Sequence, residues 1–326
     1  MRTVVLSEDG PETTALGFGC AHLLNVGASQ RQRLLETAFD AGIRHFDVAP
    51  IYGLGAAERE LGKFAAGRRD DVVLATKFGV EPGRTSSLLG AVQAPARRAL
   101  RAVPRLRRFA RSHAAALYTP PSYDRAAARR SLERSLAALR TDYVDLFLLH
   151  DPRPGDVPAE ELRAYLDQER ASGRIRAWGV AAELEAAVSV AHELGAPVPV
   201  LQTHDDVLAP SEVPAVADAR ITYGAIAGAL MPVVDHVAAD PDRRRRWSDA
   251  VGCDCADPAA VAPLLLRYAL AANPSGVVLF STTKPERIHR AAGAVEEDGA
   301  ARAGLEAFVR LVDAELRPRR PAAART

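Results

Sequence analysis

The amino-acid sequence predicts an α/β fold in which eight parallel strands and their connecting helices close into a (β/α)8 barrel. Short apolar and β-branched runs alternate with longer amphipathic stretches, which is typical of repeated strand–helix units. Eight such runs occur in order, at residues 15–18, 44–47, 72–76, 144–149, 175–180, 198–202, 221–223 and 276–280. The length of 326 residues accommodates a TIM barrel, which takes about 250 residues, together with additional segments.

The first element expected is a small β-hairpin ahead of the barrel. Residues 3–6 and 12–14 flank the turn Glu8-Asp9-Gly10-Pro11, and a hairpin there would close the bottom of the barrel. After the first strand, Ser29 is expected to cap a helix that extends to Ala41 and ends at Gly42.

The later helices are marked by polar caps, glycine stops and apolar residues at helical spacing. Asp124 is expected to cap a helix on which Leu132, Leu136 and Leu139 share one face. Further helices are expected at 158–172, 184–194, 257–272, 284–294 and 300–316. No linker or composition shift divides the chain, so residues 1–326 are interpreted as one domain with a disordered tail at 317–326.

The longest irregular segment, residues 81–123, follows the third strand and is expected to be an active-site lid. No acidic residue occurs from 82 to 123, whereas eight arginines do: Arg84, Arg97, Arg98, Arg101, Arg105, Arg107, Arg108 and Arg111. One interpretation is that they keep the lid in water. The other is that they capture an anionic substrate or the phosphates of a cofactor.

Composition excludes several classes of protein. With 42 basic and 41 acidic residues, the formal charge of +1 gives no general attraction to nucleic acid or to anionic membranes. Hydrophobic residues at 48% exclude a mainly disordered chain. There is neither an apolar run long enough to span a membrane nor a signal peptide, so a cytoplasmic location is expected. Cys20, Cys253 and Cys255 lack the spacing of a zinc site, so free thiols and no metal are expected.

Several motifs occur in a fixed order and together carry a resemblance. Asp47–Gly53 reads D-x-A-x-x-Y-G and continues into a predicted helix at 55–62; Ala75–Lys77 closes the third strand. The later motifs are residues 142–150, 173–180 and 281–288. This ordered set resembles the aldo-keto reductase family over about residues 15 to 294. The segment Leu149–Pro152 and the long loop are similar to the bacterial and plant branch that acts on aldoses and related polyols.

The resemblance implies an NADPH-dependent oxidoreductase that interconverts a carbonyl and an alcohol, with Asp47, Tyr52, Lys77 and His150 as its catalytic residues. All four lie at or just past the carboxyl ends of predicted strands, so a barrel brings them to one mouth. A free tyrosine has a pKa near 10 and donates protons poorly; a neighbouring ammonium, Lys77, lowers that pKa. Asp47 would hold Lys77, and His150 would bond to the same substrate oxygen. Taken singly, each residue also has an ordinary structural interpretation.

The cofactor residues follow from the same resemblance. Tyr223 matches the aromatic side chain that stacks on the nicotinamide, and Gln202 matches a partner of its carboxamide. Around the start of the last strand–helix unit, phosphate is favoured by backbone N–H groups and by positive charge; the residues there are Ser281, Thr282, Lys284 and Arg287. NADPH is preferred, with NADH as the alternative.

The chain departs from the family pattern at three places. Ala181-Ala182 stands where Ser-Asn is common, Gly224-Ala225-Ile226 replaces Ser-Pro-Leu, and Ala291 replaces an asparagine. Because each lost hydrogen bond costs about 0.5–1.5 kcal/mol, weaker or reoriented nicotinamide binding is expected.

The expected partner is a small carbonyl or sugar substrate, with an anionic one left open by the arginine-rich loop. Cys20, His22 and His204 are candidate substrate contacts, or else loop-packing residues. No nucleic acid, membrane or metal partner is expected, and the chain is predicted to be a monomer or a weak homo-oligomer. Two alternative functions stay open: a cofactor-binding regulatory protein, and an enzyme that uses the cofactor without net redox change.

Overall fold

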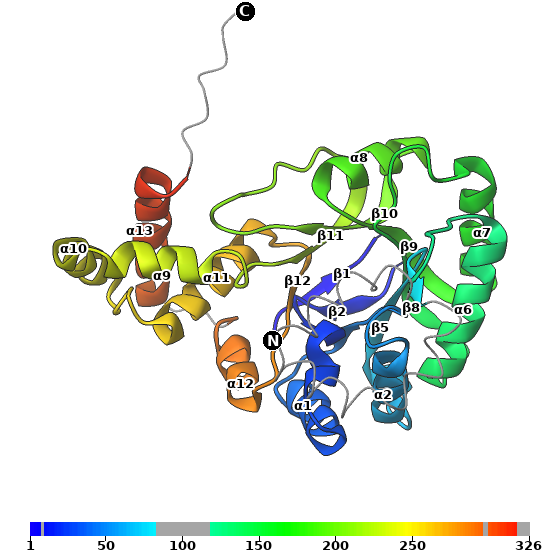
Figure 1. The fold of residues 1–326 in the computed structure, drawn as a ribbon, viewed down its shortest axis with the longest axis horizontal. Helices are drawn as coiled ribbons and strands as arrows, with labels where there is room; N and C mark the ends of the chain where they lie inside the picture. Colours follow the sequence, from blue (N-terminus) through cyan, green and yellow to red (C-terminus); the bar gives the residue numbers. More distant parts are fainter. Residues whose placement is uncertain (8–9, 83–117, 296–298, 318–326) are drawn as a thin grey trace, which may run out of the picture.

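A closed barrel of eight parallel strands forms the centre of the computed structural model, which describes residues 1–7, 10–82, 118–295 and 299–317. The strands follow one another around the barrel in chain order and β12 pairs with β3, so the predicted fold is confirmed (Figure 1). They are β3 (Leu16–Gly19), β4 (His45–Asp47), β5 (Val73–Phe78), β8 (Val144–His150), β9 (Ile175–Ala181), β10 (Val198–His204), β11 (Ala217–Tyr223) and β12 (Val277–Phe280).

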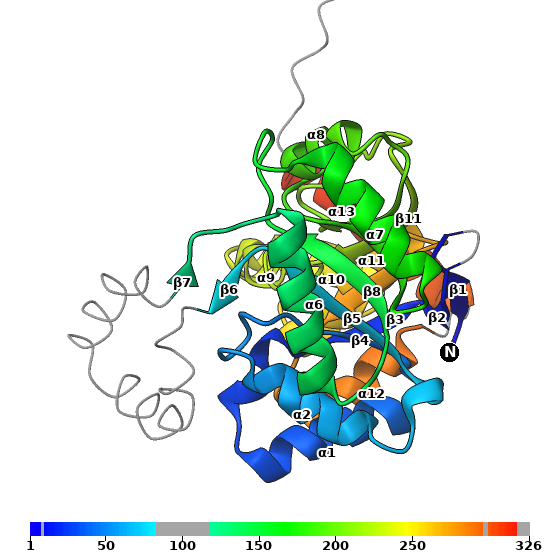
Figure 2. The same cartoon turned by 90° about the vertical axis from the view of Figure 1, so that its right-hand side faces the viewer.

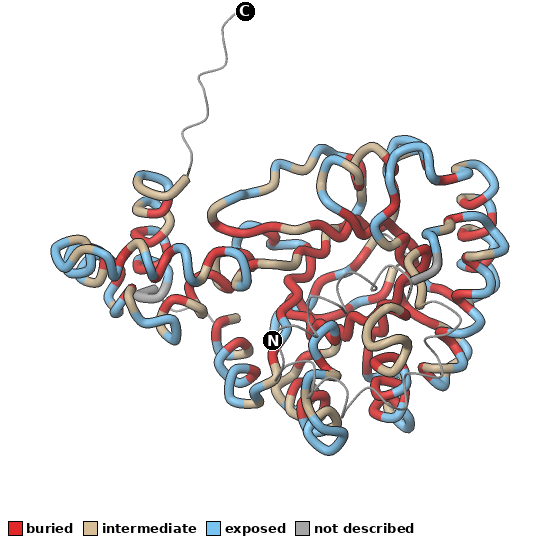
Figure 3. Tube along the Cα trace, viewed as in Figure 1, coloured by how far each residue is buried: buried red, intermediate tan, exposed pale blue. Residues whose placement is uncertain are grey.

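Helices cover the outside of the barrel, and α1, α2 and α6 lie side by side there (Figure 2). The helices between strands include α1 (Ala28–Asp40), α2 (Ala56–Ala65), α6 (Arg125–Leu139), α7 (Ala159–Ala171), α8 (Leu184–Glu193) and α11 (Pro258–Ala272). Helices α12 (Pro285–Gly293) and α13 (Gly299–Glu315) follow the last strand, β12. Two short 3-10 helices add to these, η1 (Cys20–Asn25) and η2 (Arg69–Asp71). Buried residues follow the strands, whereas the outer faces of the helices are exposed (Figure 3).

The predicted helix cap at Asp124 is confirmed, and the one at Ser29 is wrong. Asp124 accepts a hydrogen bond from the backbone N–H of Ala127. Asp257, which was not predicted as a cap, accepts one from Ala259. The prediction for Ser29 is wrong, because α1 already begins at Ala28 with Gly27 as its cap residue and no side-chain bond. A glycine can take the extended conformation before a helix without any side chain.

The N-terminal hairpin is confirmed as two short antiparallel strands, β1 (Thr3–Val5) and β2 (Glu12–Thr14). The segment after β5 begins with a second antiparallel pair, β6 (Glu81–Pro82) with β7 (Tyr118–Thr119). The predicted lid between these strands, with all eight of its arginines, lies outside the described residues, as does the predicted tail beyond Arg317.

Two helices between β11 and α11 were missed by the sequence analysis. They are α9 (Leu230–Ala238) and α10 (Pro241–Val251), and with α13 they lie at one side of the barrel (Figure 1). Their apolar faces form a second core, which includes Val233, Trp247, Leu265 and Phe308. The stretch 241–250 contains four consecutive arginines, so its amphipathic pattern is weak, and only the packing of Trp247 and Val251 buries one face.

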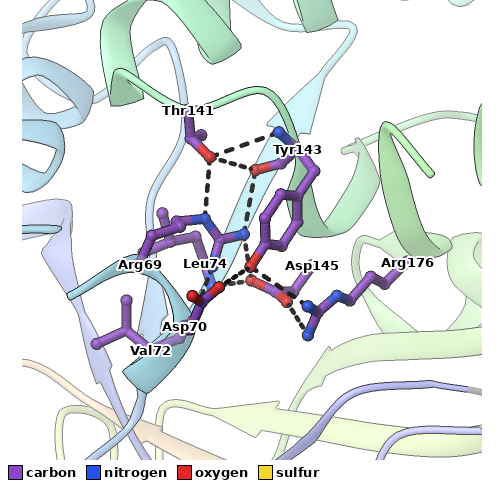
Figure 4. Close-up of polar contacts among 8 residues, drawn as sticks. All are labelled: Arg69, Asp70, Val72, Leu74, Thr141, Tyr143, Asp145 and Arg176. Atoms are coloured by element: carbon purple, nitrogen blue, oxygen red, sulfur yellow. Dashed lines mark hydrogen bonds and ion pairs between the residues drawn. The ribbon is translucent and has the colours of Figure 1, made fainter. Parts of the chain in front are cut away.

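A buried ion-pair network lies at the amino ends of β5, β8 and β9, opposite the ends where the predicted site residues stand (Figure 4). Asp145 is fully buried, with Oδ2 at 2.7 Å from Arg69 Nη2 and Oδ1 at 3.1 Å from Arg176 Nη1. Oδ2 also accepts the backbone N–H of Leu74 at 2.8 Å. Burial raises the pKa of Asp145 despite both arginines, which is typical of a pair whose desolvation offsets its attraction.

Within the described residues no helix is both long and apolar enough to cross a membrane. In the same part of the chain, no group of three or more His, Cys, Asp or Glu side chains is arranged to hold a metal ion.

Candidate active site

The carboxyl ends of the barrel strands surround a cavity of about 810 Å³. Asp47 ends β4, Lys77 lies near the end of β5, His150 ends β8, and Tyr52 stands in the loop after β4. All four line this cavity. The four residues predicted to meet at one barrel mouth are therefore brought together there.

Asp47 and Lys77 form a buried ion pair at the floor of the cavity. Lys77 Nζ lies 2.6 Å from Asp47 Oδ1 and 3.3 Å from the carbonyl oxygen of Val48. The other carboxylate oxygen, Oδ2, accepts a hydrogen bond from Gln202 Nε2 at 2.9 Å. Burial opposes the charge on Lys77, but attraction by Asp47 and Tyr52 outweighs it, so the pKa of Lys77 is raised. The lysine is thus held as an ammonium.

Tyr52 lies beside this ammonium, whose Nζ is 5.4 Å from the centroid of the tyrosine ring. The charge of Lys77 is the largest single influence and lowers the pKa of Tyr52; burial and the carboxylates of Asp47 and Asp151 raise it, and the net pKa is raised. The expectation of a lowered net pKa is therefore not met. The reason is the desolvation of the phenol together with two nearby carboxylates, neither of which the sequence reveals.

His150 faces Tyr52 edge to face, with the ring centroids 6.1 Å apart and the planes at 90°. Burial and the charge of Lys77 lower the pKa of His150 to about 3, so the imidazole is neutral at neutral pH. Its backbone carbonyl accepts a hydrogen bond from Tyr123 Oη at 2.6 Å. Tyr123 also packs over Gly79, where an added Cβ would lie 2.0 Å from the tyrosine ring.

The predicted cofactor residues line the same cavity with one exception. Gln202, Tyr223, Ser281, Thr282 and Arg287 all contribute to its wall, whereas Lys284, the cap residue of α12, does not. No side chain caps α12, so backbone N–H groups of its first turn are available to an anion.

The three candidate substrate residues are separated by the structure. His22 lines the cavity. Cys20 is fully buried in the core, where burial raises the pKa of its thiol, and it is not part of the cavity wall. The ring of His204 packs against Gly224, because a Cβ added to that glycine would lie 2.3 Å from His204 Nε2. The same Nε2 lies 3.5 Å from Asp206 Oδ2. Of the three, only His22 lines the cavity.

Sequence reasoning missed other parts of the wall. Arg290 lies one helical turn after Arg287 on α12 and lines the cavity beside it, so i, i+3 spacing was the signal that could have found it. Asp151 follows His150 with a left-handed φ of 50°, a strained conformation that no sequence signal marks. The first turns of α11 also contribute, with Asp257, Pro258, Ala259, Ala262 and Pro263.

Most of the departures from the family pattern lie at this cavity. Ala181, Ala291 and the segment 224–226 line it, whereas the buried Ala182 does not. The cavity wall is consequently small and apolar at these positions.

Comparison with known proteins identifies the family of the chain. The family model described as the aldo/keto reductase family matches residues 15–219. This chain belongs to the aldo/keto reductase family. The matched stretch contains Asp47, Tyr52, Lys77, His150 and Gln202, while Tyr223 and the α12 residues follow it.

The chain is 32% identical over 179 residues to a D-threo-aldose 1-dehydrogenase from Pseudomonas sp, a match that covers 51% of this chain and 49% of that protein. The chain thus spans about half the length of the curated relatives it matches. Its fold is shared with a glycerol dehydrogenase from Gluconobacter oxydans, at a TM-score of 0.69, 18% identity and 98% coverage of both chains. It is also shared with an aldo-keto reductase from Klebsiella pneumoniae in complex with NADPH, at a TM-score of 0.64 and 21% identity, covering 98% of this chain and 97% of that one.

Proposed function

We propose that this member of the aldo/keto reductase family is an NADPH-dependent oxidoreductase that interconverts a carbonyl and an alcohol, with Tyr52 as the general acid and base. The observation that carries the proposal is the convergence of Tyr52, His150 and the buried Asp47–Lys77 pair on one cavity. Family membership supports this reaction class.

In the direction of reduction, the substrate oxygen lies against Tyr52 and His150. NADPH, when bound, supplies a hydride to the carbonyl carbon. Tyr52 carries its proton at neutral pH, because its pKa is raised, and delivers it to the oxygen. The phenolate that remains is stabilised by the ammonium of Lys77. The neutral imidazole of His150 donates a hydrogen bond that orients the carbonyl.

The residues around the cavity fit a dinucleotide. Tyr223 presents an aromatic ring for stacking, and the uncapped start of α12 suits a phosphate group. Arg287 and Arg290 place two guanidinium groups on the wall, and among the described residues neither forms an ion pair with a carboxylate. An additional phosphate gains from such groups, so NADPH is preferred over NADH. The NADPH in the Klebsiella structure is consistent with this choice.

The substrate class we propose is an aldose or a related small carbonyl compound. The name of the Pseudomonas relative supports a sugar substrate. The small residues Ala181, Gly224 and Ala225 on the wall leave room for a hydroxylated chain. An anionic substrate would depend on arginines outside the described residues and is not proposed.

The test is NADPH consumption with a panel of aldehydes, ketones and aldoses, for the wild type and for Tyr52→Phe. We expect Tyr52→Phe to bind NADPH with unchanged fluorescence quenching and to lose about 100-fold or more of turnover. Tyr268→Phe is the matched control and should keep full turnover, because the hydroxyl of Tyr268 contacts Arg317 outside the cavity.

Other outcomes separate the alternatives. Full activity in Tyr52→Phe would contradict the assigned proton donor. NADPH binding without turnover of any compound would favour a regulatory protein, and conversion of a substrate without NADPH consumption would favour redox-neutral chemistry.

A further inference from the structure

Two cysteines occupy the turn between α10 and α11, away from the proposed catalytic residues. Helix α10 ends at Gly252, which has a left-handed φ of 82° and bonds to the carbonyl of Ser248. The chain then passes through Cys253 and Asp254 to Cys255, whose backbone N–H donates to Ser248 Oγ at 3.3 Å. This turn is therefore tied back to the last turn of α10.

Asp254, between the cysteines, further fixes the turn. Its carboxylate accepts two hydrogen bonds from Arg244, at 3.0 and 2.5 Å, and one from the backbone N–H of Ala256 at 3.0 Å. Whereas Asp254 pairs with Arg244, both cysteines contact the second core: Cys255 is one of its buried residues, and Cys253 packs against it.

The two thiols differ in their access to solvent. Cys255 is fully buried in the second core with Trp247, whereas Cys253 packs on the edge of that core and stays partly exposed. A small oxidant can therefore reach Cys253 before it reaches Cys255. Cys20, the remaining cysteine, is fully buried within the barrel core.

The thiols also interact with each other. A hydrogen bond from the Cys255 thiol lowers the pKa of Cys253 to about 7, against burial and the nearby carboxylates of Asp254 and Asp257, which raise it. The same interaction and burial raise the pKa of Cys255. At neutral pH, Cys253 is thus partly thiolate while Cys255 keeps its proton. The thiolate is the form that reacts with an oxidant, and the second thiol is then available to form the disulfide.

We infer that Cys253 and Cys255 form a redox-active dithiol that hydroperoxides convert to an intramolecular disulfide. The Cys253 thiolate attacks one oxygen of hydrogen peroxide, the O–O bond breaks, and sulfenic acid and hydroxide form. The Cys255 thiol then attacks the sulfenic sulfur, forming the S–S bond and releasing water once its proton has passed to the leaving hydroxyl. In sum, two thiols and one peroxide give one disulfide and two waters.

Cys253 and Cys255 lie outside the proposed site of hydride transfer but close to the cavity wall. The chain continues from Cys255 through Ala256 to Asp257, which caps α11 and lines the cavity wall. Oxidation therefore takes place next to an element that shapes the proposed cofactor site.

The test treats the full chain with hydrogen peroxide and follows the intact mass, with peptide mapping to assign each cysteine. The wild type is expected to lose the mass of two hydrogens, with a linkage between Cys253 and Cys255 that a thiol reductant reverses. Cys255→Ser should instead gain the mass of one oxygen at Cys253, trapped by dimedone. Cys253→Ser should stay unmodified at the same peroxide dose.

A second readout is the pH dependence of alkylation at Cys253. In the wild type, the alkylation rate should reach half of its maximum near pH 7. In Cys255→Ala the half-maximum should lie about one pH unit higher or more, because the donor thiol is removed. The proposal is overturned if that profile is the same in both proteins. It is equally overturned if the wild type accumulates oxygen adducts or intermolecular links instead of the internal disulfide.

Discussion

Asp47 and Lys77 lie 2.6 Å apart with only 5% and 3% of their side chains exposed, and this ion pair connects β4 to β5 at the cavity floor. Its second carboxylate oxygen is bonded to Gln202 on β10, so one carboxylate holds groups from two other strands. Breaking such a pair leaves a charge buried without compensation, which costs about 3–5 kcal/mol.

Asp47→Asn is expected to lower the pKa of Lys77, because Asp47 is the largest influence that raises it. If the charged lysine stabilises the phenolate, the alkaline limb of the kcat/KM profile shifts to lower pH and kcat falls by about tenfold or more. The measurement is a pH–rate profile for the wild type and the variant. An unshifted alkaline limb would contradict the role of Lys77.

Arg287→Ala and Arg290→Ala are each expected to raise the Kd of NADPH by about tenfold, with a much smaller effect on NADH, since only NADPH carries the additional phosphate. Lys284→Ala is the matched control on the same helix, because Lys284 does not line the cavity. Fluorescence titration with both cofactors checks this. Equal losses for NADPH and NADH would remove the phosphate role of the two arginines.

Asp145→Asn is expected to lower the free energy of unfolding by about 3 kcal/mol, because Arg69, with only 16% of its side chain exposed, loses its counter-charge. Arg176→Ala should cost about 1 kcal/mol or less, since 49% of that side chain is exposed. Urea denaturation measures both, and kcat should not change in either variant. Similar losses in the two variants would argue against a special role for the buried carboxylate and Arg69.

His45 predicts a pH dependence of stability. It is fully buried in β4, neither of its ring nitrogens has a hydrogen-bond partner among the described residues, and burial lowers its pKa from 6.5 to about 4. As the pH falls through this window, the unfolded chain binds a proton that the folded chain does not. Stability is therefore fully present above pH 6.5 and is lost toward pH 4.

For a single such histidine the loss approaches about 1.4 kcal/mol per pH unit. His150, whose pKa is also lowered by burial, adds in the same direction. His45→Gln should remove one of the two contributions, so denaturation curves at several pH values should show a shallower dependence. The prediction fails if the wild type and His45→Gln lose stability in parallel.

The barrel was predictable because its strands are short apolar runs whose order and spacing match repeated strand–helix units. Other features were not predictable from the sequence, for physical reasons that differ from one to the next. Helix α10 carries a weak pattern, since four consecutive arginines obscure its buried face, and the short α9 was missed with it. Ser29 resembles a cap, but the extended backbone of Gly27 starts α1 earlier. His204, Cys20 and Lys284 stand at the expected strand or helix ends but do not line the cavity. His204 packs against Gly224, Cys20 is buried in the core, and Lys284 is the cap residue of α12.

The sequence by itself determined which groups meet at the barrel mouth. A residue's place at the end of a parallel strand is a local property, and closure of the barrel follows from the repeat. Tertiary structure decided the electrostatics of those groups, namely the raised pKa of Tyr52, the neutral imidazole of His150 and the shared carboxylate of Asp47. Desolvation and charge–charge distances depend on residues far apart in the chain, such as Gln202 beside Asp47 and α11 beside α12, and therefore arise only in the folded molecule.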